Sequence, residues 1–133
     1  MKKPHLLLVE DEIDLGNVVR QYLEISDFDV DWATDGRQAF DRLRMPGNEY
    51  QLALIDIAMP EMDGLSIAHH LKGDPSTKDI PVIAVTAEAS LEQMNKARQS
   101  GFNGFLGKPL DPDRFPDQIQ RILSGEAVWE MSY

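Results

Sequence analysis

The chain has 133 residues, of which 42% are hydrophobic, and this is enough for one compact domain with a buried core. Its formal net charge of -10 argues against direct binding to nucleic acid, because a phosphate backbone requires clustered lysine and arginine. The sequence contains no cysteine, which excludes disulfide bonds, thiolate metal sites and cysteine nucleophiles.

The start of the chain does not resemble an export signal. Residues 1–4 lead directly into a short apolar run rather than into the core of a signal peptide. No apolar run approaches the roughly 18 residues that a membrane-spanning helix needs. We therefore expect a cytoplasmic protein without a membrane partner.

Hydrophobic periodicity predicts the elements of the first half of the chain. A continuous apolar run indicates a buried strand, apolar residues at three- and four-residue steps indicate a helix, and strict alternation indicates a strand at the edge of a sheet. In order, the patterns predict a buried strand at 5–9, a helix at 15–23 ended by Ser26 and Asp27, and an edge strand at 28–32. Next come a helix that carries Ala39, Phe40 and Leu43, with its cap within 34–36, and a buried strand at 52–56.

The second half continues the same alternation. The predicted elements are a helix at 64–71, a buried strand at 80–85 that ends in Thr86, a helix at 88–100, a short strand at 105–107 and a final helix. Asp111 can cap this last helix, but Pro116 lacks an amide donor, so a later start of the regular helix is the alternative. The helix at 88–100 is polar and weakly amphipathic, so we expect it to be exposed. His69 and His70 are adjacent on a helix and point about 100° apart, so they cannot bind one metal ion together.

Five strands therefore alternate with five helices, without an internal repeat or a long linker. This order predicts an α/β fold in which crossover helices cover both faces of a doubly wound, five-stranded parallel sheet. In open sheets of this kind, ligands bind at the carboxyl ends of the strands.

Asp56 is the charged residue in the otherwise apolar run 52–56. A charge in a buried strand is costly unless it lies at the carboxyl end, where open α/β sheets build their sites. The alternative is an aspartate that only caps a helix or a turn. We expect a functional role, because other predicted strand ends also carry polar groups that can converge on Asp56.

Four predicted strands end in polar residues that would meet at one edge of the sheet, namely Glu10, Asp11, Asp56, Thr86 and Lys108. Three neighbouring carboxylates repel one another, so either one of them is protonated or a hard cation binds them, and oxygen ligands favour Mg²⁺. A lysine and a hydroxyl beside a metal-bound carboxylate suit a phosphoryl group that is being transferred. Asp56 would then be the nucleophile.

Four motifs resemble those of the receiver domains of two-component response regulators. They occur in the order of that family and at the predicted strand ends, and the similarity spans about residues 4–124. The motifs are Val9-Glu10-Asp11-Glu12, the run from Asp56 to Gly64, Val85-Thr86-Ala87, and the run from Phe105 to Pro109. The resemblance implies the flavodoxin-like receiver fold with strand order 2-1-3-4-5, in a receiver domain at 1–124 that is followed by a short tail at 125–133.

The resemblance also implies the chemistry of the site. Asp56 would accept a phosphoryl group from a histidine kinase or a histidine phosphotransfer protein, with Mg²⁺ as the cofactor. The implied metal ligands are Asp11, Asp56 and the backbone carbonyl of Ala58, and Glu10 would act through water. Ala58 departs from the polar or larger residue that many relatives carry at this position, so the rate of dephosphorylation does not follow from the resemblance.

Three further roles follow from the same resemblance. Lys108 would pair with one phosphoryl oxygen, Thr86 would move to donate a hydrogen bond to another, and Phe105 would be the switching aromatic. Phe105 replaces a frequent tyrosine, so no hydroxyl holds either of its rotamers, and simple core packing is the alternative role. The resemblance further predicts a cis peptide bond between Lys108 and Pro109.

The implied protein is a signalling receiver and not an enzyme that acts on another substrate; it catalyses only its own phosphorylation and dephosphorylation. It would bind a downstream protein in a phosphorylation-dependent way or pass the phosphoryl group along a relay. The tail is too short for an output domain, which indicates a single-domain regulator. Two alternatives are a receiver excised from a larger transcription factor and an Mg²⁺-dependent aspartyl-phosphate phosphatase, although such a phosphatase usually carries a second aspartate where this chain has Ala58.

The expected output surface comprises the helix at 88–100, Phe105 and the last strand and helix. The tail residues Val128, Trp129, Met131 and Tyr133 either extend this surface, pack against the fold or are disordered.

Overall fold

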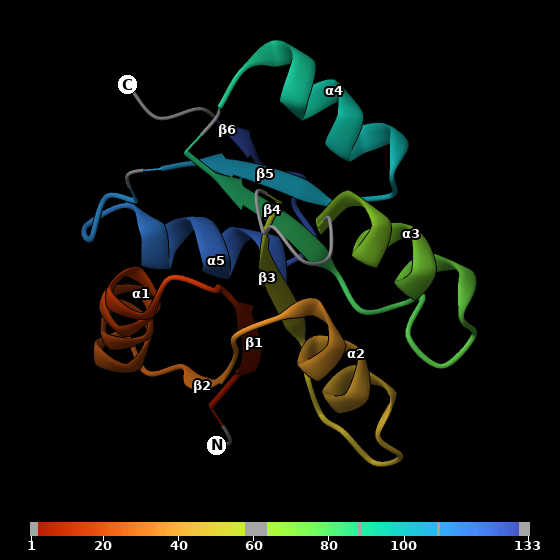
Figure 1. Cartoon of the computed structure of the whole chain (residues 1–133). Helices are drawn as coiled ribbons and strands as arrows, with labels where there is room; N and C mark the ends of the chain where they lie inside the picture. The colour runs from red at the N-terminus through yellow and green to blue at the C-terminus, as the bar shows by residue number, and fades with distance from the viewer. Residues whose placement is uncertain (1–2, 58–63, 88, 109, 131–133) are drawn as a thin grey trace.

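The computed structural model describes residues 3–57, 64–87, 89–108 and 110–130. Within these residues, parallel strands form one sheet in the order β2-β1-β3-β4-β5-β6, and helices cover both of its faces (Figure 1). The predicted doubly wound α/β fold is confirmed, with one short strand more than expected. None of the helices in the described ranges has both the length and the apolar character needed to cross a bilayer.

The strands and helices alternate along the chain up to the last strand. The strands are β1 (His5–Val9), β2 (Asp29–Ala33), β3 (Leu52–Asp56), β4 (Val82–Thr86), β5 (Gly104–Gly107) and β6 (Trp129–Glu130). The helices are α1 (Ile13–Ile25), α2 (Gly36–Arg44), α3 (Gly64–Gly73), α4 (Leu91–Gln99) and α5 (Phe115–Leu123).

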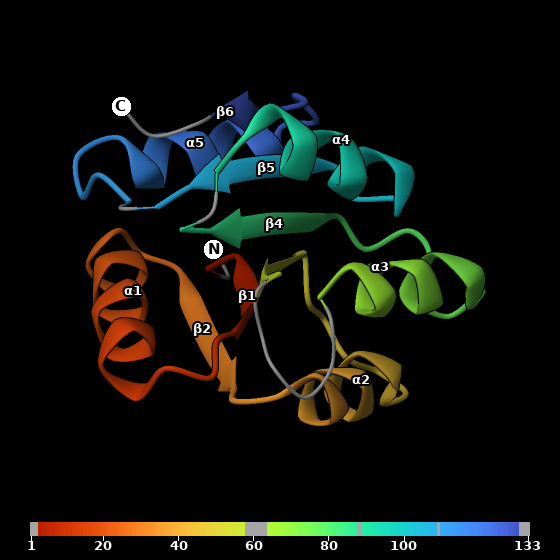
Figure 2. The ribbon, with the colours of Figure 1, turned by 45° about the horizontal axis from the view of Figure 1, so that its top comes forward.

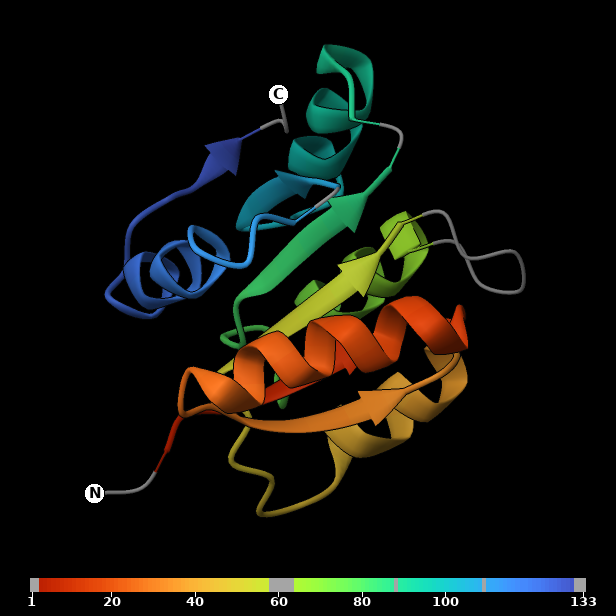
Figure 3. The same cartoon turned by 90° about the vertical axis from the view of Figure 1, so that its left-hand side faces the viewer.

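Two apolar layers hold the helices to the sheet. Successive residues of a strand point to opposite faces, so each central strand supplies both layers. Leu6 and Leu8 belong to the layer under α1 and α5, whereas Leu7 and Val9 belong to the layer under α2, α3 and α4. Figures 2 and 3 show the same division, with α1 and α5 together on one side of the sheet.

Two predicted helix boundaries are confirmed. The Asp35 carboxylate accepts a hydrogen bond of 2.8 Å from the backbone N–H of Gln38 and so caps the N-terminus of α2. Asp27 adopts φ = 69°, a left-handed conformation that lets the chain leave α1 and turn into β2.

Of the two starts considered for the final helix, the later one is correct, and Asp111 does not cap it. Its carboxylate accepts a hydrogen bond of 2.8 Å from the backbone N–H of Asp113, within a turn that precedes α5. The helix begins at Phe115, and Pro116 lies in the first turn, where its missing N–H is not needed. An aspartate carboxylate can accept a hydrogen bond from the backbone N–H two residues later in a turn as readily as it can cap the first turn of a helix.

The prediction that the fourth helix is exposed is correct for only part of its surface. The helix begins at Leu91, which is 67% exposed, after Ser90 caps it by accepting a hydrogen bond from the backbone N–H of Gln93. Met94 and Ala97 are buried against the sheet. These two side chains form a narrow apolar stripe that packs on the sheet. Because so narrow a stripe makes the helix only weakly amphipathic, the contact was not predicted from the sequence.

The strand β6 was not predicted. It pairs in parallel with β5 at the end of the sheet, with Phe105 opposite Trp129 and Leu106 opposite Glu130. Val128, directly before β6, is only 2% exposed. Of the roles considered for the tail, packing against the fold is therefore the one that the described residues 125–130 adopt.

Helix α1 packs closely on β2 through Gly16 and Trp32. A Cβ atom at Gly16 would lie 2.1 Å from the nearest carbon of the Trp32 ring, so any larger residue must displace the indole. The indole N–H donates a hydrogen bond of 2.9 Å to the backbone carbonyl of Glu10. The contact therefore supports the loop that follows β1.

Gly16→Ala is expected to lower the free energy of unfolding by about 1 to 3 kcal/mol, because the added methyl overpacks the contact with Trp32. This sign is opposite to that of helix propensity, which favours alanine over glycine by about 1 kcal/mol. Urea denaturation measures the difference. Gly73→Ala is the control: no atom lies within 4 Å of a Cβ there, so stability should stay equal or rise. An alanine at position 16 that matches or exceeds the wild-type stability would contradict the packing argument.

Candidate functional site

Strand register brings the predicted site residues to one edge of the sheet. Val9 of β1 pairs with Ile55 of β3, so the residues that follow them, Glu10 and Asp56, lie level with each other. Lys108 directly follows β5, and β4 lies between β5 and β3 in the sheet. All three residues thus leave the carboxyl ends of parallel strands, as the sequence predicts.

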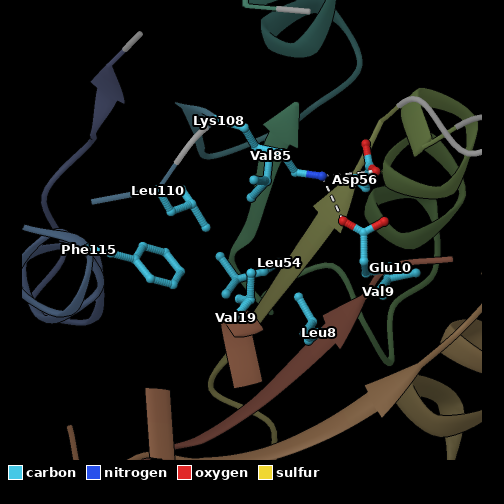
Figure 4. Close-up of a pocket in the computed structure, with 10 residues that line it drawn as sticks. All are labelled: Leu8, Val9, Glu10, Val19, Leu54, Asp56, Val85, Lys108, Leu110 and Phe115. Carbon is cyan, nitrogen blue, oxygen red and sulfur yellow. Dashed lines mark hydrogen bonds and ion pairs between the residues drawn. The ribbon is translucent and has the colours of Figure 1, made fainter. Parts of the chain in front are cut away.

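The Lys108 side chain reaches both carboxylates. Its Nζ lies 2.7 Å from Oε1 of Glu10 and 3.2 Å from Oδ2 of Asp56 (Figure 4). The three side chains are only 10%, 3% and 11% exposed, in the order Lys108, Glu10, Asp56. Buried charges are costly unless they are paired, so the ammonium compensates two carboxylates that would otherwise repel each other.

Burial and charge shift the pKa values within this group. Burial of the Glu10 carboxyl raises its pKa to about 7, and the nearby Asp56 charge acts in the same direction, against the hydrogen bond from Lys108. Burial alone would lower the pKa of Lys108, but its hydrogen bond to Glu10 and the charges of Asp56 and Glu10 raise it above its ordinary value. Lys108 is therefore a fixed positive charge, and the Glu10 carboxyl takes up a proton more readily than an ordinary glutamate does.

The same edge can hold a metal ion. Glu10, Asp11 and Asp56 each offer a carboxylate oxygen, and these oxygens all lie within 4.8 Å of one another. Asp11 is exposed, so the group is open to solvent on one side. Carboxylate oxygens in an open arrangement suit a hard divalent cation. Ala58, the predicted carbonyl ligand, lies outside the described residues, as does Pro109 of the predicted cis peptide bond.

Apolar side chains close the site from below. The space beneath the charged group measures about 10 Å³, and its lining includes Val19, Leu54 and Phe115 (Figure 4). A volume of this size accepts about one water molecule. A reacting group therefore has to approach from the loop side of the sheet edge.

Thr86 and Phe105 lie on the side of the sheet that faces α4. Both are fully buried. Phe105 pairs with Ala84, and Thr86 lies two residues beyond Ala84 on β4, so strand alternation puts all three on one face. Thr86 is the last residue of β4, and β4 lies beside β3, which ends in Asp56. Thr86 therefore lies between the acidic site and the side chains packed under α4.

His69 and His70 take no part in the acidic site. Both are exposed on α3, their ring centroids are 6.2 Å apart, and the ring of His70 contacts the edge of Phe40. Neither belongs to the cluster of potential metal ligands found among the described residues. That the two histidines cannot bind one metal ion together stays a prediction.

The sequence analysis did not identify the residues that support the site. The indole N–H of Trp32 fixes the Glu10 carbonyl, and the backbone N–H of Glu12 donates a hydrogen bond of 3.3 Å to the Glu10 carboxylate. Trp32 lies on the edge strand β2, 22 residues after Glu10. No pattern in the sequence signals a contact of this kind.

The family model described as "Response regulator receiver domain" matches residues 6–120. The chain belongs to this family. The resemblance found in its motifs is thereby confirmed. Receiver domains are signalling proteins that interact with histidine kinases or with phosphotransfer proteins.

This receiver is similar to proteins of different lengths. It is 32% identical over 123 residues to the polar-differentiation response regulator DivK of Brucella anthropi, covering 92% of this chain and 98% of DivK. It is 36% identical over 105 residues to the response regulator RppA of a Synechocystis strain, covering 79% of this chain but only 44% of RppA. Among solved structures, the chemotaxis protein CheY4 of Vibrio cholerae superposes with a TM-score of 0.83 at 26% identity, covering 90% of this chain and 98% of CheY4.

Lys108→Met is expected to lower the free energy of unfolding by about 3 kcal/mol or more in metal-free buffer, because it leaves Glu10 and Asp56 buried without a positive charge. Chemical denaturation measures the loss. The control is Lys96→Met, which breaks an exposed 3.4 Å ion pair with Glu92 on α4 and should change stability by about 0.5 kcal/mol or less. Equal effects of the two substitutions would show that the Lys108 contacts do not stabilise the receiver.

Proposed function

We propose that this receiver accepts a phosphoryl group on Asp56 from a histidine kinase or a histidine phosphotransfer protein. The observation that carries the proposal is the Lys108 ammonium, 3.2 Å from the Asp56 carboxylate at the carboxyl edge of the central strand β3. A transferred phosphoryl group spreads negative charge over its oxygens, and a fixed cation beside the acceptor stabilises that charge.

The transfer makes one bond and breaks another. A carboxylate oxygen of Asp56 forms a bond to phosphorus as the bond between phosphorus and the donor's histidine nitrogen breaks. The electron pair of the broken bond stays on the imidazole, which takes up a proton. During the transfer Lys108 holds a phosphoryl oxygen in place of part of its contact with the carboxylates. The apolar side chains beneath the site leave room for no more than about one water molecule on that side.

Mg²⁺ is the cofactor that the acidic group fits best. Asp11, Asp56 and the backbone carbonyl of Ala58 would hold the ion, and Glu10 would contribute through water. The support is that one oxygen each from Glu10, Asp11 and Asp56 lies within 4.8 Å of the others. The ion supplies positive charge that neutralises the phosphoryl oxygens, while Lys108 keeps Asp56 oriented toward the sheet edge.

The proposed protein is cytoplasmic and acts as a signalling receiver, catalysing only its own phosphorylation and dephosphorylation. Its receiver domain would extend over residues 1–124. Phosphorylation would change its binding to a downstream protein, or the phosphoryl group would pass along a relay. Membership of the receiver family favours this function over that of an Mg²⁺-dependent aspartyl-phosphate phosphatase.

Asp56→Asn is expected to abolish phosphorylation by acetyl phosphate in the presence of Mg²⁺, because the amide cannot act as the nucleophile. Intact-mass analysis should find one added phosphoryl group on the wild type and none on the variant. Asp111→Asn is the control, since this exposed carboxylate lies in the turn before α5 and should leave labelling unchanged. Full Mg²⁺-dependent labelling of the Asp56 variant would refute the assignment.

Thr86 and Phe105 are proposed to carry the signal from the phosphoryl group to α4. The Phe105 ring is already fully buried, so phosphorylation cannot gain stability by burying it further. A Thr86 hydroxyl drawn toward the phosphoryl group would instead change the packing among β4, β5 and α4. A change of only about 1.4 kcal/mol there shifts a two-state population tenfold.

Beryllofluoride, a phosphoryl mimic, is expected to change amide exchange near Thr86 and Phe105 in the wild type. Thr86→Ala should suppress the changes near Phe105, because the link between the two positions is then missing. Hydrogen exchange followed by mass spectrometry measures both proteins, with the edge strand β2 as an internal control that should not respond. Changes confined to residues 57–64 in both proteins would show that the signal takes another route.

A further inference from the structure

The short loop at 10–12 joins β1 to α1 and supplies two of the three carboxylates at the acidic edge. The Glu10 carboxylate is held in place by Lys108. Asp11 is exposed, and in the part of the chain that the structure describes no hydrogen bond or ion pair holds its carboxylate. The position of the Asp11 carboxylate therefore depends on how the backbone beside it is held.

The backbone of this loop is held by β2. The N–H of Glu10 donates a hydrogen bond of 3.0 Å to the carbonyl of Ala33, and the carbonyl of Glu10 accepts one of 2.9 Å from the indole N–H of Trp32. The Glu10 carbonyl and the Asp11 nitrogen belong to one planar peptide unit. The indole bond therefore sets the orientation of the peptide from which Asp11 starts.

The indole replaces a donor that the sheet does not supply at this point. The pairing of β1 with β2 ends at Ala33, after which the chain turns toward α2. A longer β2 would donate its next backbone N–H to the Glu10 carbonyl, and the Trp32 side chain does so instead. Glu10 is only 2% exposed, so without the indole its carbonyl would be left buried and unpaired.

Helix α1 holds the indole in place. It lies beside β2 in Figures 2 and 3, and the Trp32 ring packs on Gly16. The Arg20 guanidinium lies 5.8 Å from the ring centroid, within the range of a cation–π contact. Arg20 in turn donates a hydrogen bond of 3.0 Å to the Asn17 side chain and lies 3.3 Å from the Glu24 carboxylate. The donor of the Glu10 carbonyl is thus fixed by residues outside the acidic edge.

A metal ion needs the carboxylates of Glu10, Asp11 and Asp56 in place at the same time. One oxygen of each already lies within 4.8 Å of the others. If the loop were loose, binding the ion would have to restrict Asp11, and that loss of freedom would weaken the affinity. Groups that orient metal ligands without touching the ion typically change metal affinity by roughly 10- to 100-fold.

We propose that Trp32 is a positioning residue of the metal site. Its indole N–H orients the peptide between Glu10 and Asp11 and so keeps the Asp11 carboxylate beside Asp56. The proposal deepens the proposed function and rests on it in one respect, namely that Mg²⁺ binds at Asp11 and Asp56. Trp32 belongs to neither the ligands nor the phosphoryl acceptor, so its loss should change the binding of the ion and not the chemical step.

Trp32→Phe in the full chain keeps an aromatic ring beside α1 but removes the N–H donor. Isothermal titration calorimetry should find about tenfold weaker Mg²⁺ binding than in the wild type. Phosphorylation by acetyl phosphate should need about tenfold more Mg²⁺ for half of its maximal rate, whereas the rate at saturating Mg²⁺ should stay within about twofold. In the metal-free protein, NMR relaxation should show lower order parameters for the backbone amides of Asp11 and Glu12.

Two further proteins separate the hydrogen bond from packing. Val30→Ala is the matched control, since Val30 packs in the same layer under α1 but lies opposite Leu6, away from the loop. It should lower stability and leave the Mg²⁺ affinity within about twofold of the wild type. The second protein carries 3-benzothienylalanine at position 32, which keeps the shape of the indole but has sulfur in place of the N–H. It should bind Mg²⁺ as weakly as Trp32→Phe does.

Equal Mg²⁺ affinity of wild type and Trp32→Phe would overturn the proposal. So would wild-type affinity of the benzothienyl protein, because packing and not the N–H would then be responsible, and so would an equal loss in Val30→Ala. None of these results would affect the assignment of Asp56 as the phosphoryl acceptor. A wild type that binds no Mg²⁺ would overturn both this proposal and the proposed cofactor, and that failure is recognised without any variant.

Discussion

The ion pairs that Lys108 makes with Glu10 and Asp56 are the interaction on which the site depends. Glu10 lies 98 residues and Asp56 52 residues before Lys108, so these contacts exist only after the parallel sheet has assembled. The lysine leaves β5, passes the end of β4 and reaches the ends of β3 and β1. The Lys108 ammonium thus allows two carboxylates to remain buried side by side. It also provides a positive charge at the site before a reaction adds further negative charge there.

Much of this arrangement could be predicted from the sequence, because the signals are local. Continuous apolar runs that end in Glu10, Asp56, Thr86 or Lys108 indicate buried strands with polar carboxyl ends, and parallel strands bring those ends to one edge. The prediction failed where several local structures compete for the same residues. Asp111 bonds within a turn rather than at a helix start, and a polar helix was expected to be exposed although Met94 and Ala97 bury part of it.

Other contacts leave no trace in the sequence pattern. The described part of β6, Trp129–Glu130, is too short to show a period, so the strand is recognised only from its pairing with β5. The close approach of Gly16 to Trp32 likewise arises from the packing of α1 on β2, and neither residue is unusual in its own segment. Such contacts depend on where the elements lie relative to one another, which periodicity does not determine.

The positions of the two tryptophans have an optical consequence. The indole of Trp32 is hydrogen-bonded to the carbonyl of Glu10, and the ring of Trp129 lies against the guanidinium of Arg98, and the sequence has no third tryptophan. Tryptophan fluorescence of this receiver therefore combines two native reporters, one beside the acidic edge and one on β6. Replacing either tryptophan leaves a single indole reporter, so changes near Glu10 and changes at β6 can be followed separately without an attached dye.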